Sequence, residues 1–257
     1  MKQVEELKHY DEVKDWNFDE FNIKSESLTN WELYDILANI ATKDSRILDL
    51  GTGGGEKVLQ RFPVVKEILA TDFSEEMLKT ANRILVKSGR TDVTFRFMNN
   101  LEMDTPDDYF DIVVARNTVT DPKQIYKTLK PGGTLLVHGV DMHDCWDLKL
   151  LFGKGQGFHD KKPISVVDFE NIIKAGFKDV ELVPICEREY FDDVEKFKKF
   201  LKKVPILQDF SEEDCSNEKH HYTPEIDEEL LDKYIKENTS NGLVKLRRRY
   251  YGISAKK

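Results

Sequence analysis

The chain has 257 residues, of which 34% are charged, and its formal net charge is −9 at pH 7. A chain of this length can bury a sizeable hydrophobic core, and the acidic balance argues against a broad nucleic-acid surface, because such surfaces neutralise phosphates with lysine and arginine. The three cysteines are odd in number and widely spaced, and reduced thiols in a cytoplasmic protein are their simplest interpretation.

The sequence has no apolar run of the roughly 20 residues that a membrane-spanning helix needs, and its first residues lack the apolar core of a signal peptide. We therefore expect a cytoplasmic protein that has no membrane partner. Cys215, His220 and His221 lie in a polar stretch without a fourth ligand at a suitable spacing, so no metal site is predicted. The sequence leaves open whether the protein is a monomer or a homodimer.

Residues 1–44 form a polar leader, rich in aromatic residues, that we expect to be helical. From Trp31 to Ala41 the apolar side chains recur at helical spacing, and Thr29 or Asn30 suits the N-cap. The pattern leaves open whether this leader only packs on a sheet or also closes over a pocket.

The stretch RILDLGTGGGE, residues 46–56, has the pattern of a buried strand that ends in a tight turn and continues into a helix. Such a unit holds phosphates or cofactors at the edge of a doubly wound sheet. The dinucleotide fingerprint fails because its third glycine would fall at Glu56, and the lysine of a P-loop is missing. The turn therefore suits a ligand with a cationic amino acid part. Its candidate contacts are Asp49, Gly51, Thr52, Gly53 and Gly55.

The next expected strand, residues 68–72, ends in Asp72, about 20 positions after Gly51, which is the spacing of an acid that accepts hydrogen bonds from ribose. One ionised carboxylate matches the two donors of a diol. The alternative is that Asp72 only caps the helix that Ser74 begins, which we expect over residues 74–86. Phe73 and Met77 follow closely enough to pack on an adenine ring.

Three further strands are expected at residues 93–97, 110–117 and 134–137, with a helix before the last of them that ends at Lys130-Pro131-Gly132-Gly133. The carboxyl ends of parallel strands open on one crevice, where ligands bind. The strand at 93–97 leads to Asn99, Asn100 and Leu101, and the strand at 110–117 ends in Arg116 and Asn117.

Four segments, RILDLGTGGGE, ATDFSEEML, YFDIVVARN and LKPGGTLLV, resemble in order and spacing the motifs of class I S-adenosylmethionine-dependent methyltransferases. The resemblance covers residues 46–137. Within the family, the sequence is similar to the small-molecule enzymes of the ubiquinone/menaquinone-biosynthesis-like group called methyltransferase type 11. It implies that S-adenosylmethionine is the cofactor and S-adenosylhomocysteine the product.

The resemblance also implies roles for individual residues. The family usually has an aspartate at the position of Asn100, where it accepts a hydrogen bond from the adenine amino group, and asparagine keeps a carbonyl acceptor. Residues just after the 110–117 strand lie near the transferred methyl group, which makes Asn117 a candidate substrate contact. Arg116 either holds the carboxylate of the cofactor or pairs with a nearby acid. The predicted cofactor-binding residues are Asp49, Gly51, Thr52, Gly53, Gly55, Asp72, Phe73, Ser74, Met77, Asn99, Asn100, Leu101 and Arg116.

The chemistry beyond the fifth strand is less clear. His143 is a candidate general base because imidazole titrates near neutral pH, and Trp146 and Tyr190 are candidate substrate contacts. A linker or gate over residues 153–163 precedes a helix over 165–175 and a strand over 180–185.

We predict a single α/β domain over residues 1–257: a Rossmann-like, seven-stranded, mostly parallel sheet with helices on both faces, an antiparallel last strand and a helical cap. Its expected parts are the leader 1–44, the core 45–185, the cap 186–242 and the closing strand 243–257. The predicted function is transfer of a methyl group from S-adenosylmethionine to a small-molecule acceptor by direct displacement. The alternatives are an RNA-modifying methyltransferase, a non-catalytic S-adenosylmethionine-binding protein and a dinucleotide-dependent oxidoreductase.

Overall fold

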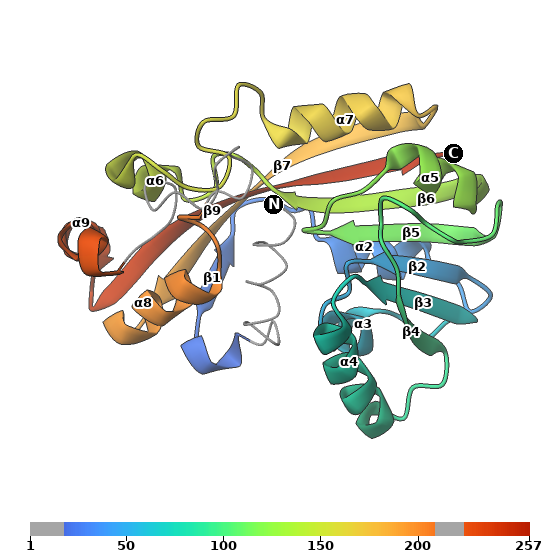
Figure 1. Cartoon of the computed structure of the whole chain (residues 1–257), viewed down its shortest axis with the longest axis horizontal. Coiled ribbons are helices and arrows are strands. Elements are labelled where there is room, and N and C mark those ends of the chain that lie inside the picture. The colour runs from blue at the N-terminus through green and yellow to red at the C-terminus, as the bar shows by residue number, and fades with distance from the viewer. Residues whose placement is uncertain (1–17, 209–223) are drawn as a thin grey trace.

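A computed structural model describes residues 18–208 and 224–257, and its centre is one twisted sheet (Figure 1). Within these residues the strands follow the order β1-β7-β9-β6-β5-β2-β3-β4, and β8 pairs with β9. The strands are β1 (Lys24–Ser27), β2 (Arg46–Leu50), β3 (Glu67–Asp72), β4 (Val93–Phe97), β5 (Phe110–Arg116), β6 (Leu129–Val140), β7 (Lys178–Phe191), β8 (Thr239–Ser240) and β9 (Leu243–Lys256). The helices are η1 (Asp19–Phe21), α2 (Leu33–Ile40), α3 (Glu56–Arg61), α4 (Glu75–Ser88), α5 (Pro122–Thr128), α6 (Trp146–Phe152), α7 (Ile164–Lys174), α8 (Val194–Lys203) and α9 (Pro224–Asn238).

The sheet confirms the predicted fold. The strands β4, β3, β2, β5 and β6 pair in parallel, and β9 runs antiparallel to both β6 and β7. These seven strands are the expected Rossmann-like sheet with its antiparallel last strand. The carboxyl ends of β2, β3 and β5 therefore open on one crevice, as the sequence predicts.

Apolar side chains hold helices on both faces of the sheet. On one face, Leu37 of α2 and Val58 of α3 pack with Ile47 and Val114 of the strands. On the other, α5 and α7 pack over β5, β6 and β9 through residues such as Ile125 and Ile172. Because both faces are covered, the central strands are almost continuously apolar.

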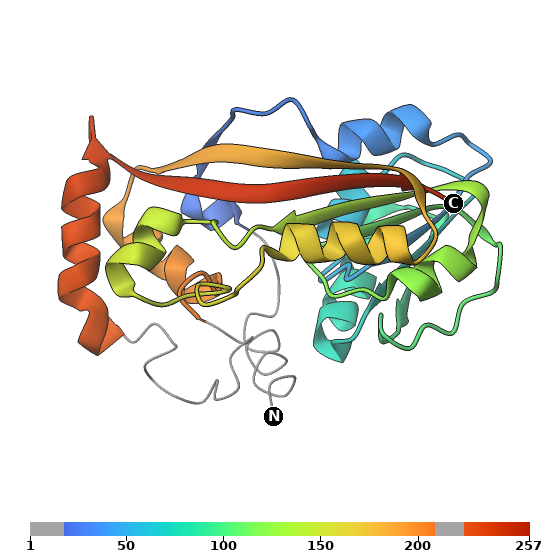
Figure 2. The same ribbon diagram turned by 90° about the horizontal axis from the view of Figure 1, so that it is seen from above.

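The strands β7 and β9 continue well past the parallel strands and carry a second group of helices (Figure 2). There η1, α6, α8 and α9 surround a separate apolar cluster that includes Phe191, Phe200, Leu231 and Leu246. We call this cluster with its helices the second lobe. The strand expected at residues 180–185 is thus much longer, and the helices of the predicted cap begin only after Phe191.

The expectation of a wholly helical leader is wrong within residues 18–44, because β1 lies there as an edge strand paired with β7. Its four side chains are all exposed and polar, so the sequence KSES carries no alternating pattern. Main-chain hydrogen bonds to β7, 160 or so residues away, form this strand instead. The helix expected from Trp31 to Ala41 is confirmed as α2, but its N-cap is Glu32, which accepts from the amide of Asp35, and not Thr29 or Asn30. Residues 1–17 lie outside the described ranges.

In the ranges that the structure describes, every helix is too short or too polar to cross a membrane. Those same residues contain no group of three or more histidine, cysteine or acidic side chains that could hold a metal. Cys215, His220 and His221 lie outside the described residues.

Candidate functional site

The glycine turn between β2 and α3 is shaped by left-handed backbone conformations and by close neighbours. Gly51 and Gly55 have φ angles of 72° and 79°, which favour glycine. A Cβ atom at Gly51 would lie 2.6 Å from Cβ of Thr118, and one at Gly55 would lie 2.6 Å from Cζ of Phe95. Glycine is therefore required both by conformation and by space, and the bare main chain lies at the carboxyl end of β2.

Two hydrogen bonds join this turn to β3. The amide of Thr52 donates to the carbonyl oxygen of Thr71 at 2.9 Å, and the amide of Gly53 donates to Oδ2 of Asp72 at 2.7 Å. Oδ1 of Asp72 accepts from the amide of Ser74 at 2.9 Å. The Asp72 carboxylate thus lies between the turn and the start of α4, where the sequence places the ribose.

The start of α4 has the predicted capping residue. Oγ of Ser74 accepts from the amide of Met77 at 3.3 Å, so Ser74 is the N-cap. Met77 is buried in the core, whereas Phe73 is 37% exposed and its ring lies 5.2 Å from that of Phe97. Of the two residues expected to contact adenine, Phe73 is the one that faces outward.

The loop after β4 supplies an acceptor that suits an adenine amino group. Nδ2 of Asn100 donates to Oγ1 of Thr118 at 2.9 Å, while Oδ1 of Asn100 is buried and has no hydrogen-bond partner within the described residues. A buried acceptor of this kind costs free energy unless a donor reaches it. Asn99 shapes the loop by accepting from the amide of Leu101, whose side chain is 43% exposed. The buried acceptor of Asn100 therefore fits the amino group of the predicted cofactor's adenine.

A buried acid and a guanidinium group lie on the neighbouring strands β2 and β5. Asp49 on β2 is buried, and burial raises the pKa of its carboxyl to about 7, although the charge of Arg116 opposes this shift. Arg116, at the end of β5, makes no hydrogen bond or ion pair with residues 18–208 or 224–257. The alternative role of Arg116 in a salt bridge is thus not seen in this part of the chain.

The crevice also contains a histidine that the sequence analysis passed over. His138 of β6 pairs in register with Arg116 of β5, and its Nδ1 lies 3.2 Å from Oδ1 of Asn117. The expected strand ended at Val137, and no motif in the sequence gave a role to the histidine directly after it. The one available signal was its position directly after the LKPGGTLLV segment.

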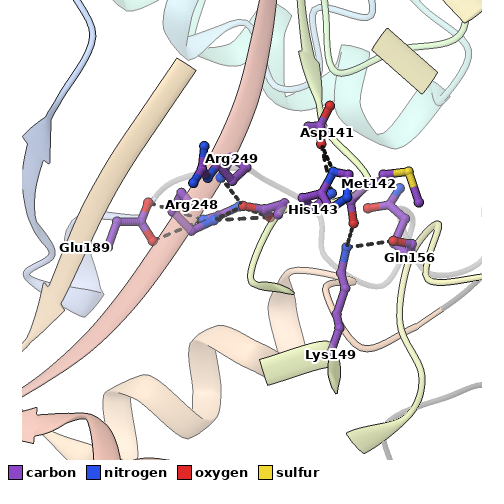
Figure 3. Close-up of polar contacts among 9 residues, drawn as sticks. Asp141, Met142, His143, Lys149, Gln156, Glu189, Arg248 and Arg249 are labelled. Carbon is purple, nitrogen blue, oxygen red and sulfur yellow. Dashed lines mark hydrogen bonds and ion pairs between the residues drawn. The ribbon is translucent and has the colours of Figure 1, made fainter. Parts of the chain in front are cut away.

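The predicted general base His143 lies in the loop before α6. Its backbone amide and its Nδ1 both contact Oδ1 of Asp141, each at 2.9 Å (Figure 3). Its ring is 4.9 Å from that of Trp146. Oδ2 of Asp141 accepts from Oγ of Ser165. The structure thus brings His143 and Trp146 together, and their roles toward a substrate stay predictions.

The same loop is held in place by buried charges. Nζ of Lys149 donates to the carbonyl oxygens of Met142 and Gln156, at 3.1 and 2.7 Å (Figure 3). Arg248 lies between the carboxylates of Asp144 and Glu189, with Nε 3.0 Å from Asp144 and Nη1 3.1 Å from Glu189. These contacts join the loop after β6 to the long strands β7 and β9.

Tyr190, the third candidate substrate contact, lies in the outer part of β7. It pairs with Lys24 of β1, and its hydroxyl donates to Glu26 at 3.1 Å. Gly252 of β9 pairs with His138 of β6 on one side and with Val183 of β7 on the other. Tyr190 therefore lies seven residues further along β7 than the position level with His138. The structure does not bring it together with the glycine turn.

Comparison with known proteins identifies the family. The sequence matches the family described as "Methyltransferase domain" over residues 41–205. Among curated proteins, the ubiquinone/menaquinone biosynthesis C-methyltransferase UbiE of Proteus mirabilis is 32% identical over 118 residues, which are 42% of this chain and 47% of that protein. The chain thus spans about half the length of the curated relatives it matches.

Solved structures share the fold. BH2331 of Bacillus halodurans superposes with a TM-score of 0.57 at 20% identity, over 87% of this chain and 98% of that chain. Phosphoethanolamine N-methyltransferase 2 of Haemonchus contortus, solved with phosphomonomethylethanolamine and S-adenosylhomocysteine, gives 0.51 at 20% identity, over 89% and 53%. Because the family match covers more than half of the chain, this protein belongs to the S-adenosylmethionine-dependent methyltransferases.

Proposed function

We propose that this protein transfers the methyl group of S-adenosylmethionine to a small-molecule acceptor. The observation that carries the proposal is a pair of groups at the carboxyl edge of the sheet, the buried Oδ1 of Asn100 and the guanidinium of Arg116, neither of which has a hydrogen-bond or ion-pair partner within the described residues. One group needs a donor and the other needs an anion. An adenine amino group and an amino acid carboxylate are such partners, and S-adenosylmethionine carries both.

Neighbouring residues at this edge fit the middle of the same molecule. Asp72 offers a carboxylate at the glycine turn for the ribose hydroxyls. Asp49 is a buried carboxyl group beside Arg116 and is suited to the cofactor's ammonium group. The bound cofactor supplies a methyl group on a positively charged sulfur, which is already a strong electrophile. The chain therefore has to orient the acceptor and exclude water, and orientation alone supplies on the order of 7–11 kcal/mol.

Two observations favour a small acceptor. The net charge of −9 suits neither RNA nor DNA, and the curated relative from Proteus mirabilis is named for a step in quinone biosynthesis. The aromatic rings of Trp31 and Tyr250 lie next to His138 at the edge of the crevice, where they can contact a compact organic molecule.

The test is methyl transfer from tritium-labelled S-adenosylmethionine in clarified extract of the expression host. Three fractions are counted separately: molecules below about 1 kDa, RNA and protein. We expect label in the small-molecule fraction with the natural protein, and much less label with Asp72→Ala when S-adenosylmethionine is held below the Kd of the natural protein. Label confined to RNA or protein would contradict a small acceptor. Binding of S-adenosylhomocysteine without label in any fraction would instead favour a non-catalytic binding protein.

A further inference from the structure

His138 is at the point where the parallel part of the sheet meets its antiparallel strand. It pairs in register with Arg116 on one side and with Gly252 of β9 on the other. The Arg116 pairing is the last one that β5 and β6 make, so His138 lies at the carboxyl edge of the sheet. Arg116 in turn is close enough to Asp49 to influence its ionisation. His138 therefore borders the proposed cofactor site.

Aromatic rings frame the imidazole. The indole of Trp31 lies nearly parallel to it, at 6.4 Å between centroids and an interplanar angle of 29°, and the ring of Tyr250 lies at 5.0 Å. Gly252 makes room for this arrangement, because a Cβ atom there would be 2.5 Å from Cε2 of Trp31. The ring of His138 is thus held by contacts from the leader and from β9.

Asn117 fixes the tautomer of the imidazole. Its amide donates to the carbonyl oxygen of His138 at 2.8 Å, and its Oδ1 lies 3.2 Å from Nδ1 of His138. An amide oxygen can only accept a hydrogen bond, so Nδ1 carries the hydrogen and Nε2 keeps its lone pair. Asn117 adopts a left-handed conformation with a φ angle of 51°, which non-glycine residues seldom adopt without such local hydrogen bonds.

The surroundings of the ring keep it uncharged. Burial lowers the pKa of His138 to about 4, and the charges of Arg116 and Arg248 act in the same direction. Tyr250, the other titratable group against the ring, stays protonated because burial raises the pKa of its phenol. An imidazole of this kind is too weak a base to deprotonate an ammonium group. Methylation of a hydroxyl group first produces a protonated ether, which is a strong acid. Even a weakly basic imidazole accepts a proton from it readily.

We propose that His138 is the proton acceptor of the reaction and that the acceptor molecule presents a hydroxyl group to its Nε2. In this step the hydroxyl oxygen forms a bond to the methyl carbon, and the carbon–sulfur bond breaks with its electron pair left on sulfur. The hydroxyl proton passes to Nε2 of His138, which later releases it to solvent. The inference rests on the proposed methyl transfer and adds the chemical class of the acceptor and the catalytic residue.

The first test needs no acceptor. The full chain, labelled with ¹⁵N-histidine and saturated with S-adenosylhomocysteine, is studied by NMR between pH 6 and 8, and the His138 signals are identified by their loss in His138→Gln. We expect an uncharged ring with hydrogen on Nδ1 and none on Nε2 at every pH. Asn117→Leu should produce a mixture of tautomers. A ring that is charged at pH 7, or that carries its hydrogen on Nε2, would overturn the proposal.

The second test uses the small-molecule fraction that the natural protein labels with tritium. His138→Gln should lower kcat by about 10²- to 10⁴-fold, while the Kd for S-adenosylhomocysteine changes less than about twofold. His159→Gln, which replaces an exposed histidine of the 153–163 loop, is the matched control and should keep the natural kcat. The labelled product should be an O-methyl compound.

An unchanged kcat in His138→Gln, or a product methylated on nitrogen, sulfur or carbon, would overturn the proposal. If His138→Gln no longer binds S-adenosylhomocysteine, His138→Asn takes its place in the same assay. If the natural protein labels no small molecule at all, the proposed function fails. The tautomer seen by NMR then still shows whether Nε2 of His138 keeps its lone pair.

Discussion

The carboxylate of Asp72 accepts a hydrogen bond from the amide of Gly53 at 2.7 Å, which ties the end of β3 to the glycine turn that follows β2. The two segments that a ribose and an amino acid part would contact are therefore joined before any ligand binds. This contact makes Asp72 the natural first residue to test.

Asp72→Ala should weaken binding of both S-adenosylhomocysteine and adenosine by at least about 10- to 100-fold, because the loss of even one hydrogen bond to a charged group costs about 1.5–3 kcal/mol. Isothermal titration calorimetry measures both affinities. Glu76→Ala removes an exposed acid from the same helix region, where it pairs with Lys79 on the surface, and serves as the control. Equal affinities in Asp72→Ala and Glu76→Ala would show that the ribose binds elsewhere.

Arg116→Met should separate the two ends of the cofactor. If Arg116 holds the carboxylate, affinity for S-adenosylhomocysteine falls about 10-fold or more, while affinity for adenosine, which lacks that group, stays the same. The same calorimetric titrations check this. Arg83→Met, at an exposed position on α4, is the control. A parallel loss of adenosine binding would point to a structural role of Arg116 instead.

The raised pKa of Asp49 predicts a particular pH dependence of stability. Its folded pKa of about 7 lies above the ordinary value of 3.8, so between these values the folded protein keeps a proton that the unfolded chain has lost. The free energy of unfolding therefore falls as pH rises from about 4 to 7, by on the order of 4 kcal/mol for this group. The free energy of unfolding of Asp49→Asn lacks this pH dependence. Measured by urea unfolding, Asp49→Asn should therefore gain stability relative to the natural protein as pH rises over that range. A difference that does not change with pH would contradict the shift.

The same group predicts proton release on cofactor binding. An ammonium group beside Asp49 favours the ionised carboxylate, so binding of S-adenosylhomocysteine at pH 6 should release a proton. Calorimetry in two buffers with different ionisation enthalpies detects the proton, and Asp49→Asn should abolish the difference between buffers. Identical heats in both buffers with the natural protein would place the ammonium group away from Asp49.

Two neighbouring arginines on β9, one buried and one exposed, allow the contribution of buried charge to stability to be compared. Arg248 is buried between Asp144 and Glu189, and its guanidinium lies over the rings of Tyr250 and Phe200. Arg248→Met leaves two buried carboxylates without their cation, which should cost about 3–5 kcal/mol of unfolding free energy. Arg247 pairs with Asp147 at the surface, so Arg247→Met should cost less than about 1 kcal/mol. Urea unfolding measures both, and equal losses would contradict the assigned roles.

Short-range chemistry explains what the sequence alone determined. The apolar run of β2, the glycines after it and the N-cap Ser74 each depend on residues within a few positions, and the strand expected at 93–97 is confirmed with its bounds. Four such segments in family order were enough to predict the sheet and the cofactor. They also placed Asp72 and the glycine turn at one edge.

Contacts between distant segments decided the rest. The edge strand β1 exists through its pairing with β7, and the long β7 and β9 are stabilised by each other and by the second lobe. His138 acquires its neighbours from the leader, from β5 and from β9, as its contacts with Trp31, Asn117 and Tyr250 show. No local pattern encodes such an environment, because burial and tautomer depend on side chains that only folding brings together.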